Sequence, residues 1–421
     1  MTRRAALGLV LVAACAPARP GVAPSPVPAD TARAPHAAPL PSTPDTVAAA
    51  PVAVAPPTRP VVSPRTYRRA SSPGVIHLTF TGDINLGTTL LPDGVPPDSG
   101  RDLLSPVDSL LTGDLVIGNF EGALSDTLPP AKCGPREERC YTFRTPPFLA
   151  ARLKDAGFTD LNLANNHSLD LGPAGRLATE AELDSLGIPH YGPLGEIAFD
   201  TLQVGDSLRV VALVGFTTYP DAYDLLDLDR SRQVVDSVRK LADVVIVTFH
   251  GGAEGDKAIR TGAGMERLGR EKRGDLRQWA HAMIDAGADA VVGHGPHVLR
   301  GIEFWRRRLI AYSMGNFLTY RGFSLAGYKG ITAVLHLELD PHGAFVAARL
   351  VPLRQLARVG PRPDPTRAAL RLVRRVTKLD FPGTGAAILA DGSLVAVPPH
   401  PSHLAASPTA ASPGPRRAGP R

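Results

Sequence analysis

The chain has 421 residues, of which 43% are hydrophobic and 20% are charged, so it is long enough to bury a sizeable core and to carry additional segments. Its net charge of +6 comes from the ends, because residues 74–397 contain 35 basic and 38 acidic residues. The basic residues form no basic helix with interleaved aromatic residues, and we therefore expect no nucleic-acid partner.

The first fifteen residues are typical of an export signal. Arg3 and Arg4 precede an apolar run over residues 5–14, which is shorter than the roughly 20 residues that a bilayer core requires. The run ends in Leu11-Val-Ala-Ala-Cys15, which resembles the bacterial lipobox, where the cysteine is lipidated and becomes the mature N-terminus. An ordinary cleavable signal or a short anchor is the alternative. We expect residues 1–15 to be a lipoprotein signal peptide and the protein to be an exported lipoprotein of the cell envelope, membrane-anchored through Cys15 on the periplasmic or surface side.

The composition predicts where the chain folds. Fifteen of its 42 prolines fall within residues 16–73, a stretch of Ala, Pro, Ser and Thr without periodicity. We predict a disordered linker over 16–73 and a similar disordered tail over 398–421. The folded part is then a domain over 74–360 with a C-terminal extension over 361–397.

Two cysteines remain for the folded part. Cys133 and Cys140 have six residues between them, and in an oxidising compartment this pair favours a disulfide. A metal site made of cysteines alone needs more ligands than the pair supplies.

From residue 74 the sequence alternates short apolar runs with helical patterns. In chain order we predict strands over 75–80 and 114–119, a helix over 147–156, a strand over 159–163, a helix over 173–186, a strand over 209–215, a helix over 232–241, a strand over 243–249, a helix over 276–285, strands over 289–292 and 309–312, and an antiparallel pair over 331–339 and 344–351. This order is typical of βαβ units and a mostly parallel sheet.

Polar residues cluster where these strands end. Parallel sheets bind ligands beyond the carboxyl ends of their strands, so residues from different clusters are expected to meet there. The candidates are Asp83, Glu121, Asn166, His167, His250, His294 and His297.

Carboxylate, amide and imidazole groups form a mixed oxygen and nitrogen ligand set. Such a set suits Zn, Mn or Fe, and a pair of ions where a carboxylate or amide bridges, with attack of an activated water on an ester or amide as the chemistry. A metal-free alternative is that the same groups bind an anionic polymer. Asp83 and Glu121 could also form a glycosidase pair, although nothing else favours that interpretation.

Several segments, taken together, resemble the CapA family of capsule (poly-γ-glutamate) synthesis proteins, whose domain is similar to the calcineurin-type metallophosphoesterase fold. They cover roughly residues 75–320. The segments are Thr81-Gly-Asp-Ile-Asn-Leu-Gly87, Gly118-Asn-Phe-Glu-Gly122, Phe143-Arg-Thr-Pro-Pro147, Asn162-Leu-Ala-Asn-Asn-His167, Asp170-Leu-Gly172, His250 with Gly252 and Glu254, Gly293-His-Gly-Pro-His297 and Ser313-Met-Gly-Asn-Phe317.

The resemblance implies a fold, a site and partners. The fold would be a four-layer α/β/β/α sandwich of the metallophosphoesterase-like type. His167, oriented by Asp170, would donate a proton to a leaving group. The other implied roles are metal binding by Asp83, Glu121, Asn166, His250, His294 and His297, and substrate binding by Asn119, Arg144, Glu254 and Asn316. The implied partners are an anionic capsule polymer, the membrane and other capsule-synthesis membrane proteins.

Two positions depart from the family pattern. The first strand ends in Gly82-Asp-Ile84 without the Asp-x-His of phosphoesterases, and Gly251 follows His250 where the family usually has Trp. We expect the insertion around Cys133 and Cys140 to form a local lid.

Three functions are compatible with these residues. The first is a lipid-anchored protein for the biosynthesis, export or anchoring of a capsule polymer. The second is a metal-dependent phosphoesterase or polymer hydrolase at the cell surface. The third is a non-catalytic module that binds an anionic polymer through Arg144 and the histidines.

Overall fold

The computed structural model describes residues 61–62, 68–69, 74–134 and 140–396. The expected signal peptide with Cys15, most of the expected linker and the expected tail over 398–421 lie outside these residues. Within the described part, none of the helices combines the length and the apolar character that a membrane span needs.

One sheet of nine strands comes mainly from the middle of the chain. Its order is β1-β7-β8-β10-β13-β15-β14, with β2 beside β7 and β9 beside β8. Strands β8, β10, β13 and β15 are parallel, and β7 and β14 flank them in the antiparallel direction. The strands are β1 (Val61–Val62), β2 (Arg68–Arg69), β7 (Glu196–Val204), β8 (Ser207–Thr217), β9 (Tyr223–Asp224), β10 (Val244–His250), β13 (Ala290–His294), β14 (Ile302–Trp305) and β15 (Arg308–Ala311).

A second sheet of eight strands combines the two ends of the folded part. Its order is β19-β18-β17-β3-β4-β5-β6, with β16 beside β3. Strands β3 to β6 are parallel, whereas β17 pairs with β3 in the antiparallel direction. The strands are β3 (Ile76–Asn85), β4 (Leu115–Phe120), β5 (Asp160–Asn162), β6 (His190–Tyr191), β16 (Asn316–Thr319), β17 (Ile331–Leu339), β18 (Phe345–Leu356) and β19 (Gly360–Pro363).

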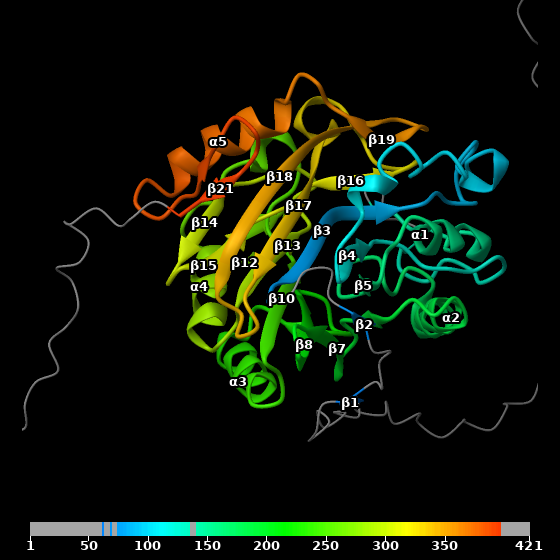
Figure 1. Cartoon of the computed structure of the whole chain (residues 1–421). Coiled ribbons are helices and arrows are strands. Elements are labelled where there is room, and N and C mark those ends of the chain that lie inside the picture. The colour runs from blue at the N-terminus through cyan, green and yellow to red at the C-terminus, as the bar shows by residue number, and fades with distance from the viewer. Residues whose placement is uncertain (1–60, 63–67, 70–73, 135–139, 397–421) are drawn as a thin grey trace, which may run out of the picture. The chain divides into compact units, whose positions relative to one another are not determined.

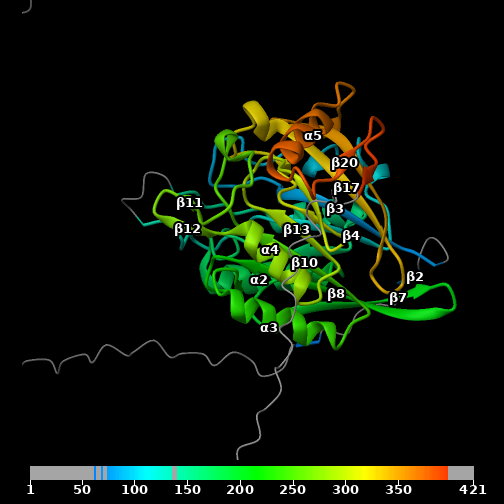
Figure 2. The ribbon, with the colours of Figure 1, turned by 90° about the vertical axis from the view of Figure 1, so that its left-hand side faces the viewer.

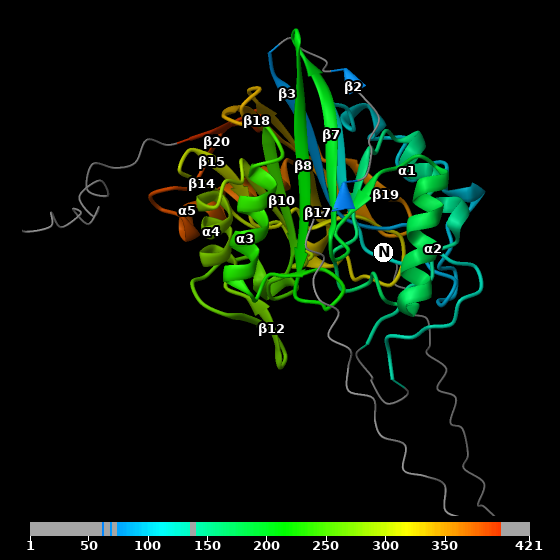
Figure 3. The ribbon, with the colours of Figure 1, turned by 90° about the horizontal axis from the view of Figure 1, so that it is seen from below.

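Helices cover the outer faces of both sheets. The α-helices are α1 (Ala151–Asp155), α2 (Gly172–Ser185), α3 (Leu228–Arg239), α4 (Leu276–Asp285) and α5 (Ala368–Asp380). One apolar cluster joins α3 and α4 to the first sheet, and another joins α1 and α2 to the second. Figure 3 shows these two pairs of helices on opposite sides of the strands.

Short elements complete the chain. The hairpin β11–β12 lies at the opposite end of the molecule from the turn between β7 and β8 (Figures 2 and 3). These elements are the hairpins β11 (Glu266–Leu268) with β12 (Glu271–Gly274) and β20 (Ala387–Ile388) with β21 (Leu394–Val395), and the 3-10 helices η1 (Asp98–Gly100), η2 (Asp108–Leu110), η3 (Pro147–Leu149), η4 (Asp256–Ala258) and η5 (Gly327–Gly330).

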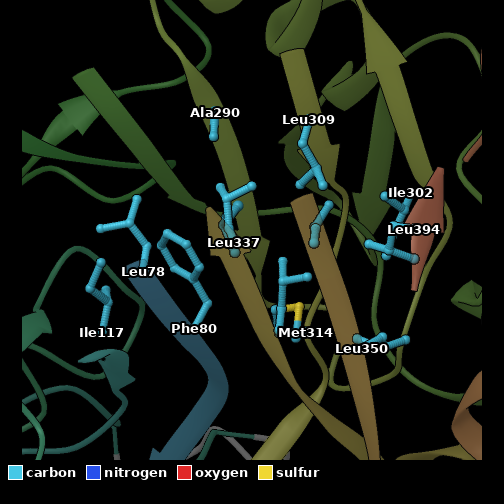
Figure 4. Packing of buried hydrophobic residues seen from close by; sticks show 14 of the residues in the cluster. Leu78, Phe80, Ile117, Ala290, Ile302, Leu309, Met314, Leu337, Leu350 and Leu394 are labelled. Carbon is cyan, nitrogen blue, oxygen red and sulfur yellow. The ribbon is translucent and has the colours of Figure 1, made fainter. Parts of the chain in front are cut away.

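The main core lies between the two sheets. Leu78 and Phe80 of β3 face Ala290 of β13 and Leu309 of β15 across this layer (Figure 4). Helix α5 contributes Leu370 and its neighbours to the same cluster and contacts strands of both sheets, so it closes one edge of the sandwich. The expected four-layer α/β/β/α arrangement is therefore confirmed (Figure 1).

The predicted elements all form, with local differences. The helix expected over 147–156 is divided into η3 and α1, because the Pro146-Pro147 pair restricts the backbone at its start. Strand β7 and helix α5 have no counterpart among the predicted elements. Two dipeptides within the expected linker, β1 and β2, pair with β7.

A close approach of two backbones joins β3 to the segment before β16. The amide of Asp83 donates to the carbonyl of Gly315 over 2.8 Å. A Cβ atom added at Gly82 would lie 1.9 Å from that same carbonyl oxygen. No side chain fits at this position unless the backbone moves.

We expect Gly82→Ala to lower the free energy of unfolding by about 1–3 kcal/mol, because the added methyl group must push the two segments apart. Gly262→Ala is the control, since a Cβ there meets no atom within 4 Å, and it should change the stability by less than about 0.5 kcal/mol. Urea unfolding of both variants measures the difference. Equal effects would contradict the importance of this contact.

Candidate metal centre

Strand register places the polar residues of each sheet in one row. In the second sheet Asp83 of β3 pairs with Asn119 of β4, which pairs with Asn162 of β5. In the first sheet His250 of β10 pairs with His294 of β13. Residues that pair across parallel strands share a face of the sheet, so each row presents its side chains together.

The two rows contact each other through side chains. Asn119 Nδ2 donates to Asp83 Oδ1 over 2.8 Å and lies 3.2 Å from Nδ1 of His250. The ring of His297, in the loop after β13, donates from Nδ1 to Asp83 Oδ2 over 3.0 Å. His294 Nε2 donates to the carbonyl of Thr81 over 3.0 Å. The site is therefore assembled between the sheets from both of them.

Glu121 lies at the centre of this group. Its Oε1 is 3.7 Å from Nε2 of His250, 3.7 Å from Nε2 of His297 and 3.8 Å from Nε2 of His167. The carboxyl group is completely buried, and neither oxygen has a hydrogen-bond partner among the described residues. Three imidazole nitrogens and one carboxyl oxygen thus converge without bonding to one another.

This spacing suits a metal ion. In a tetrahedral site with ligands about 2.1 Å from the ion, neighbouring ligand atoms are about 3.4 Å apart, close to the 3.7 Å between Oε1 of Glu121 and Nε2 of His297. One ligand atom from each of Asp83, Glu121 and His297 lies within 4.8 Å of the others. Buried polar atoms normally have partners, so the unpartnered carboxyl of Glu121 makes this group a candidate cation site.

The carboxyl groups and His297 have strongly shifted pKa values. Burial raises the pKa of Glu121 well above its ordinary value. Burial also opposes the charged form of Asp83, but the hydrogen bond and positive charge of His297 outweigh it and lower that pKa. Burial opposes the imidazolium of His297, but Glu121 and the hydrogen bond to Asp83 outweigh it and raise the pKa of His297 to about 10.

The other histidines are shifted in the opposite direction. Burial lowers the pKa of His250 well below its ordinary value, and the positive charge of Arg273 adds to this effect. Burial also lowers the pKa of His167 and of His294, although carboxylates nearby act against it. These three rings are neutral at pH 7, which is the form in which imidazole coordinates a metal or accepts a proton.

His297 has an unusual backbone. Its φ is +58°, in the left-handed region that residues with a side chain rarely adopt. Such a conformation costs of order 1 kcal/mol and persists where the surroundings impose it. Here it directs the ring towards Asp83 and Glu121.

His167 and Asp170 form a buried pair, as expected from the sequence. His167 Nδ1 donates to Asp170 Oδ2 over 2.7 Å. The same oxygen accepts from the amide of Phe143 over 2.6 Å, and Lys132 Nζ lies 3.1 Å from Oδ1. The ring of Phe143 packs against His167 with 4.6 Å between centroids. Asp170 therefore fixes the ring of His167 with Nε2 towards Glu121.

The disulfide expected between Cys133 and Cys140 is present. Cys133 directly follows Lys132, and Nζ of this lysine also donates to the carbonyl of Asn166 over 2.6 Å. Cys133 Sγ lies 3.0 Å from Thr142 Oγ1. The cross-linked loop thus brings Lys132 and Phe143 to the His167–Asp170 pair from its two ends.

The remaining predicted residues differ in whether their polar atoms already have partners. Oδ1 of Asn166 and Oδ1 of Asn316 are buried and have no partner among the described residues, so both are available to a ligand. Glu254 Oε2 lies 3.9 Å from His297 Nε2. The guanidinium of Arg144 donates to Thr89 Oγ1 and to the carbonyl of Leu128.

The sequence did not indicate a buried arginine behind Glu254. Arg273, at the end of the β11–β12 hairpin, is fully buried. It donates to Glu254 Oε1 over 3.1 Å, to the hydroxyl of Tyr219 and to Glu271. In the sequence Arg273 belongs to a run of charged residues that is typical of an exposed hairpin, and no local signal distinguishes it from Arg270 or Lys272.

The structure accounts for both departures from the family pattern. Asn85, two residues after Asp83, donates to the carbonyl of Glu121 over 3.0 Å and so supports the centre from behind. A Cβ at Gly251 would lie 2.9 Å from a methyl group of Leu225 and 3.0 Å from the carbonyl of Arg273. A large side chain does not fit at position 251 beside these neighbours.

The centre is thus a buried carboxylate–imidazole site between the sheets of a four-layer α/β sandwich. A family model described as "Bacterial capsule synthesis protein PGA_cap" matches residues 77–321. The chain belongs to this family of bacterial capsule synthesis proteins.

Two relatives show the extent of the similarity. The chain is 30% identical over 293 residues to the PGA biosynthesis protein CapA of Bacillus subtilis (strain 168), covering 65% of this chain and 71% of that protein. It is 30% identical over 275 residues to the capsule biosynthesis protein CapA of Bacillus anthracis, covering 59% of this chain and 60% of that protein.

Solved structures are more distant. A hypothetical protein from Thermus thermophilus has a TM-score of 0.36 and 20% identity, covering 66% of this chain and 99% of that chain. A 5'-nucleotidase precursor from the same organism has a TM-score of 0.36 and 15% identity, covering 72% of this chain and 59% of that chain. At these TM-scores the similarities carry no inference about the site.

We expect Lys132→Met to lower the free energy of unfolding by about 1–3 kcal/mol, because it leaves the buried Asp170 without its cation. Lys240→Met is the matched control. Lys240 forms an exposed pair with Asp236, and its loss should change the stability by less than about 1 kcal/mol. Chemical unfolding curves of both variants provide the comparison, and a Lys132→Met protein as stable as the control would contradict this role.

Proposed function

We propose that this protein acts in the biosynthesis, export or anchoring of an anionic capsule polymer of the poly-γ-glutamate type, as a lipid-anchored protein of the cell envelope. Family membership supports the capsule role, and the relatives from Bacillus subtilis and Bacillus anthracis carry names of the same kind. The N-terminal pattern that ends at Cys15 supports the lipid anchor. The partners are the polymer, the membrane and other capsule-synthesis membrane proteins.

The observation that carries a chemical role is the buried Glu121 with three imidazole nitrogens directed at one of its oxygens. We propose that Glu121 and His297, with Asp83 behind His297, hold a divalent ion, which is Mn, Fe or Zn. The amide oxygen of Asn166 has no partner among the described residues and is a candidate ligand for a second ion, whereas Asn316 would bind the substrate. When bound, the ion polarises an ester or amide oxygen of the substrate and neutralises charge that develops on it.

The protein's own groups then orient the substrate and move a proton. Asp170 accepts from Nδ1 of His167, so Nε2 of that ring is the atom that accepts a proton and returns it to a leaving group. The rings of Phe143 and Phe323 stack with 4.9 Å between centroids and both contact His167, which keeps water from its edge. Arg273 holds Glu254 beside His297.

A metal-dependent phosphoesterase or polymer hydrolase is the second candidate, and the same cluster around Glu121 favours it. The non-catalytic polymer-binding alternative has less support, because a site for an anionic polymer does not account for the buried, unpartnered carboxyl of Glu121. Its main cation, Arg144, uses two of its five N–H donors on Thr89 and Leu128.

We expect the full chain, purified without chelators, to contain a stoichiometric divalent metal that Glu121→Gln and His297→Ala lose. Both variants remove a proposed ligand, and elemental analysis measures the content. Gln203→Ala is the control, because Gln203 lies on the distant β7 strand, and it should retain the metal. A wild-type protein that takes up no Mn, Fe or Zn on reconstitution would exclude the metal centre.

We expect metal affinity to increase with pH. Burial raises the pKa of Glu121, and the pKa of His297 is about 10, so in the metal-free protein both groups hold protons that the ion must displace. Each proton released strengthens binding roughly tenfold per pH unit below the pKa of the group. Calorimetric titrations between pH 6 and 9, in buffers of different ionisation enthalpy, count these protons. Affinity that does not change with pH would contradict the assignment.

We expect deletion of the gene to remove the surface polymer and the wild-type gene to restore it. Cys15→Ser tests the anchor and Glu121→Gln tests the centre, and neither should restore the polymer to more than a small fraction of the wild-type amount. Immunoblots verify that each variant is produced. Polymer that is unaffected by the deletion would contradict the proposed function, whereas rescue by Glu121→Gln alone would leave a capsule role that does not use the centre.

A further inference from the structure

The three histidines around Glu121 all direct Nε2 towards it, but this nitrogen does not carry a proton in every ring. The Nδ1 atoms of His167 and His297 both face carboxylate oxygens, at 2.7 Å from Asp170 and 3.0 Å from Asp83. A carboxylate accepts hydrogen bonds, so both rings carry their proton on Nδ1. In the neutral ring, Nε2 then presents a lone pair towards Glu121.

The orientation of Asn119 determines the state of the third ring, His250. Two neighbouring amides fix that orientation through the backbone. Asn165 Nδ2 donates to the carbonyl of Phe120, and its Oδ1 accepts from the amide of His167. Asn162 Oδ1 accepts from the amide of Ala164. Neither amide can be reversed without losing these bonds.

Both fixed amides direct their nitrogen to the same atom. Asn162 Nδ2 lies 3.0 Å from Asn119 Oδ1, and Asn165 Nδ2 lies 3.2 Å from it. The oxygen of Asn119 therefore points towards these two donors. Its Nδ2 points the other way, towards Asp83 and His250.

His250 must accept from this nitrogen. Nδ2 of Asn119 has two hydrogens, one for Asp83 Oδ1 and one for Nδ1 of His250 at 3.2 Å. If Nδ1 of His250 carried a proton, two N–H groups would face each other in a buried site, and buried donors without an acceptor destabilise the fold. The neutral ring therefore carries its proton on Nε2.

We infer that His250 is a hydrogen-bond donor to an oxyanion, either a phosphoryl or a carboxylate oxygen, and not a metal ligand. Its Nε2 is completely buried, has no partner among the described residues and lies 3.7 Å from Glu121 Oε1, too far for a hydrogen bond. His250 also lies outside the group of Asp83, Glu121 and His297 whose ligand atoms are within 4.8 Å of one another. The sequence predicted the role of a metal ligand for His250. The inference rests on the proposed function, because that function places a bound anion at this centre.

The tautomer itself can be measured without any metal. In the full chain, labelled with ¹⁵N-histidine and stripped by a chelator, long-range ¹H–¹⁵N correlation spectra distinguish a protonated from an unprotonated ring nitrogen. We expect His250 to be protonated at Nε2 alone and His167 at Nδ1 alone, whereas His297, whose pKa is about 10, carries a proton on both nitrogens in the metal-free protein. His250 with a bare Nε2 would overturn the inference whether or not the protein binds a metal.

Substitution separates the donor role from a ligand role. His250→Gln should bind the metal with an affinity within about twofold of the wild type. It should bind inorganic phosphate, acetate or both at least about tenfold more weakly, as measured by calorimetry. The anion whose affinity falls shows whether His250 donates to a phosphoryl or to a carboxylate oxygen. His297→Gln should lose the metal, and His342→Gln, at an exposed position, should change neither property. Loss of metal from His250→Gln in parallel with His297→Gln, with unchanged thermal unfolding, would overturn the inference. A wild-type protein without metal would contradict the proposed metal centre, and the spectra would still decide the state of His250.

Discussion

Asn119 is the group through which the two halves of the site are connected. Its amide uses its full hydrogen-bonding capacity, with two donors towards Asp83 and His250 and an oxygen that accepts from Asn162 and Asn165. One of these partners belongs to the opposite sheet, so the amide couples the row of β3, β4 and β5 to β10. Only the planar primary amides of Asn and Gln offer two donors and two acceptor positions, and Asn is the shorter of the two. This explains why a polar side chain is buried at the centre of an otherwise apolar sandwich.

Glu121 shows the opposite behaviour at the same depth. It is as buried as Asn119, but its oxygens have no hydrogen-bond partner among the described residues and its pKa is raised well above the ordinary value. An unpaired buried carboxylate destabilises the fold, and proteins retain such groups where a ligand compensates. The neighbouring amides have all their hydrogen bonds and this carboxyl has none, so the two kinds of group differ in whether they have free capacity for a ligand.

The sequence pattern predicted most of the strands and placed polar residues at their ends, whereas the four-layer arrangement was implied by the family resemblance. Short buried strands produce apolar runs that are easily recognised, and their carboxyl ends identified Asp83, Glu121, His250 and His297. The sequence could not predict what depends on three-dimensional neighbours. Lys132 and Arg273 resemble ordinary surface cations, and their burial follows from a disulfide-linked loop and from a hairpin that packs back on the site. Helix α5 closes the sheets at their edge, but it carries none of the polar residues at strand ends on which the prediction was based.

The location of the centre between the sheets also links its occupation to the stability of the fold. Asp83 lies in β3 and Glu121 directly follows β4 of the second sheet, whereas His250 ends β10 and His297 follows β13 of the first. An ion bound to groups from both sheets stabilises the packed state relative to any state in which the sheets separate. Without that ion, the packing of the apolar core between the sheets must compensate for a buried, unpartnered carboxyl and for the left-handed backbone of His297. A ligand bound at Glu121 would therefore be a part of what holds the two sheets together.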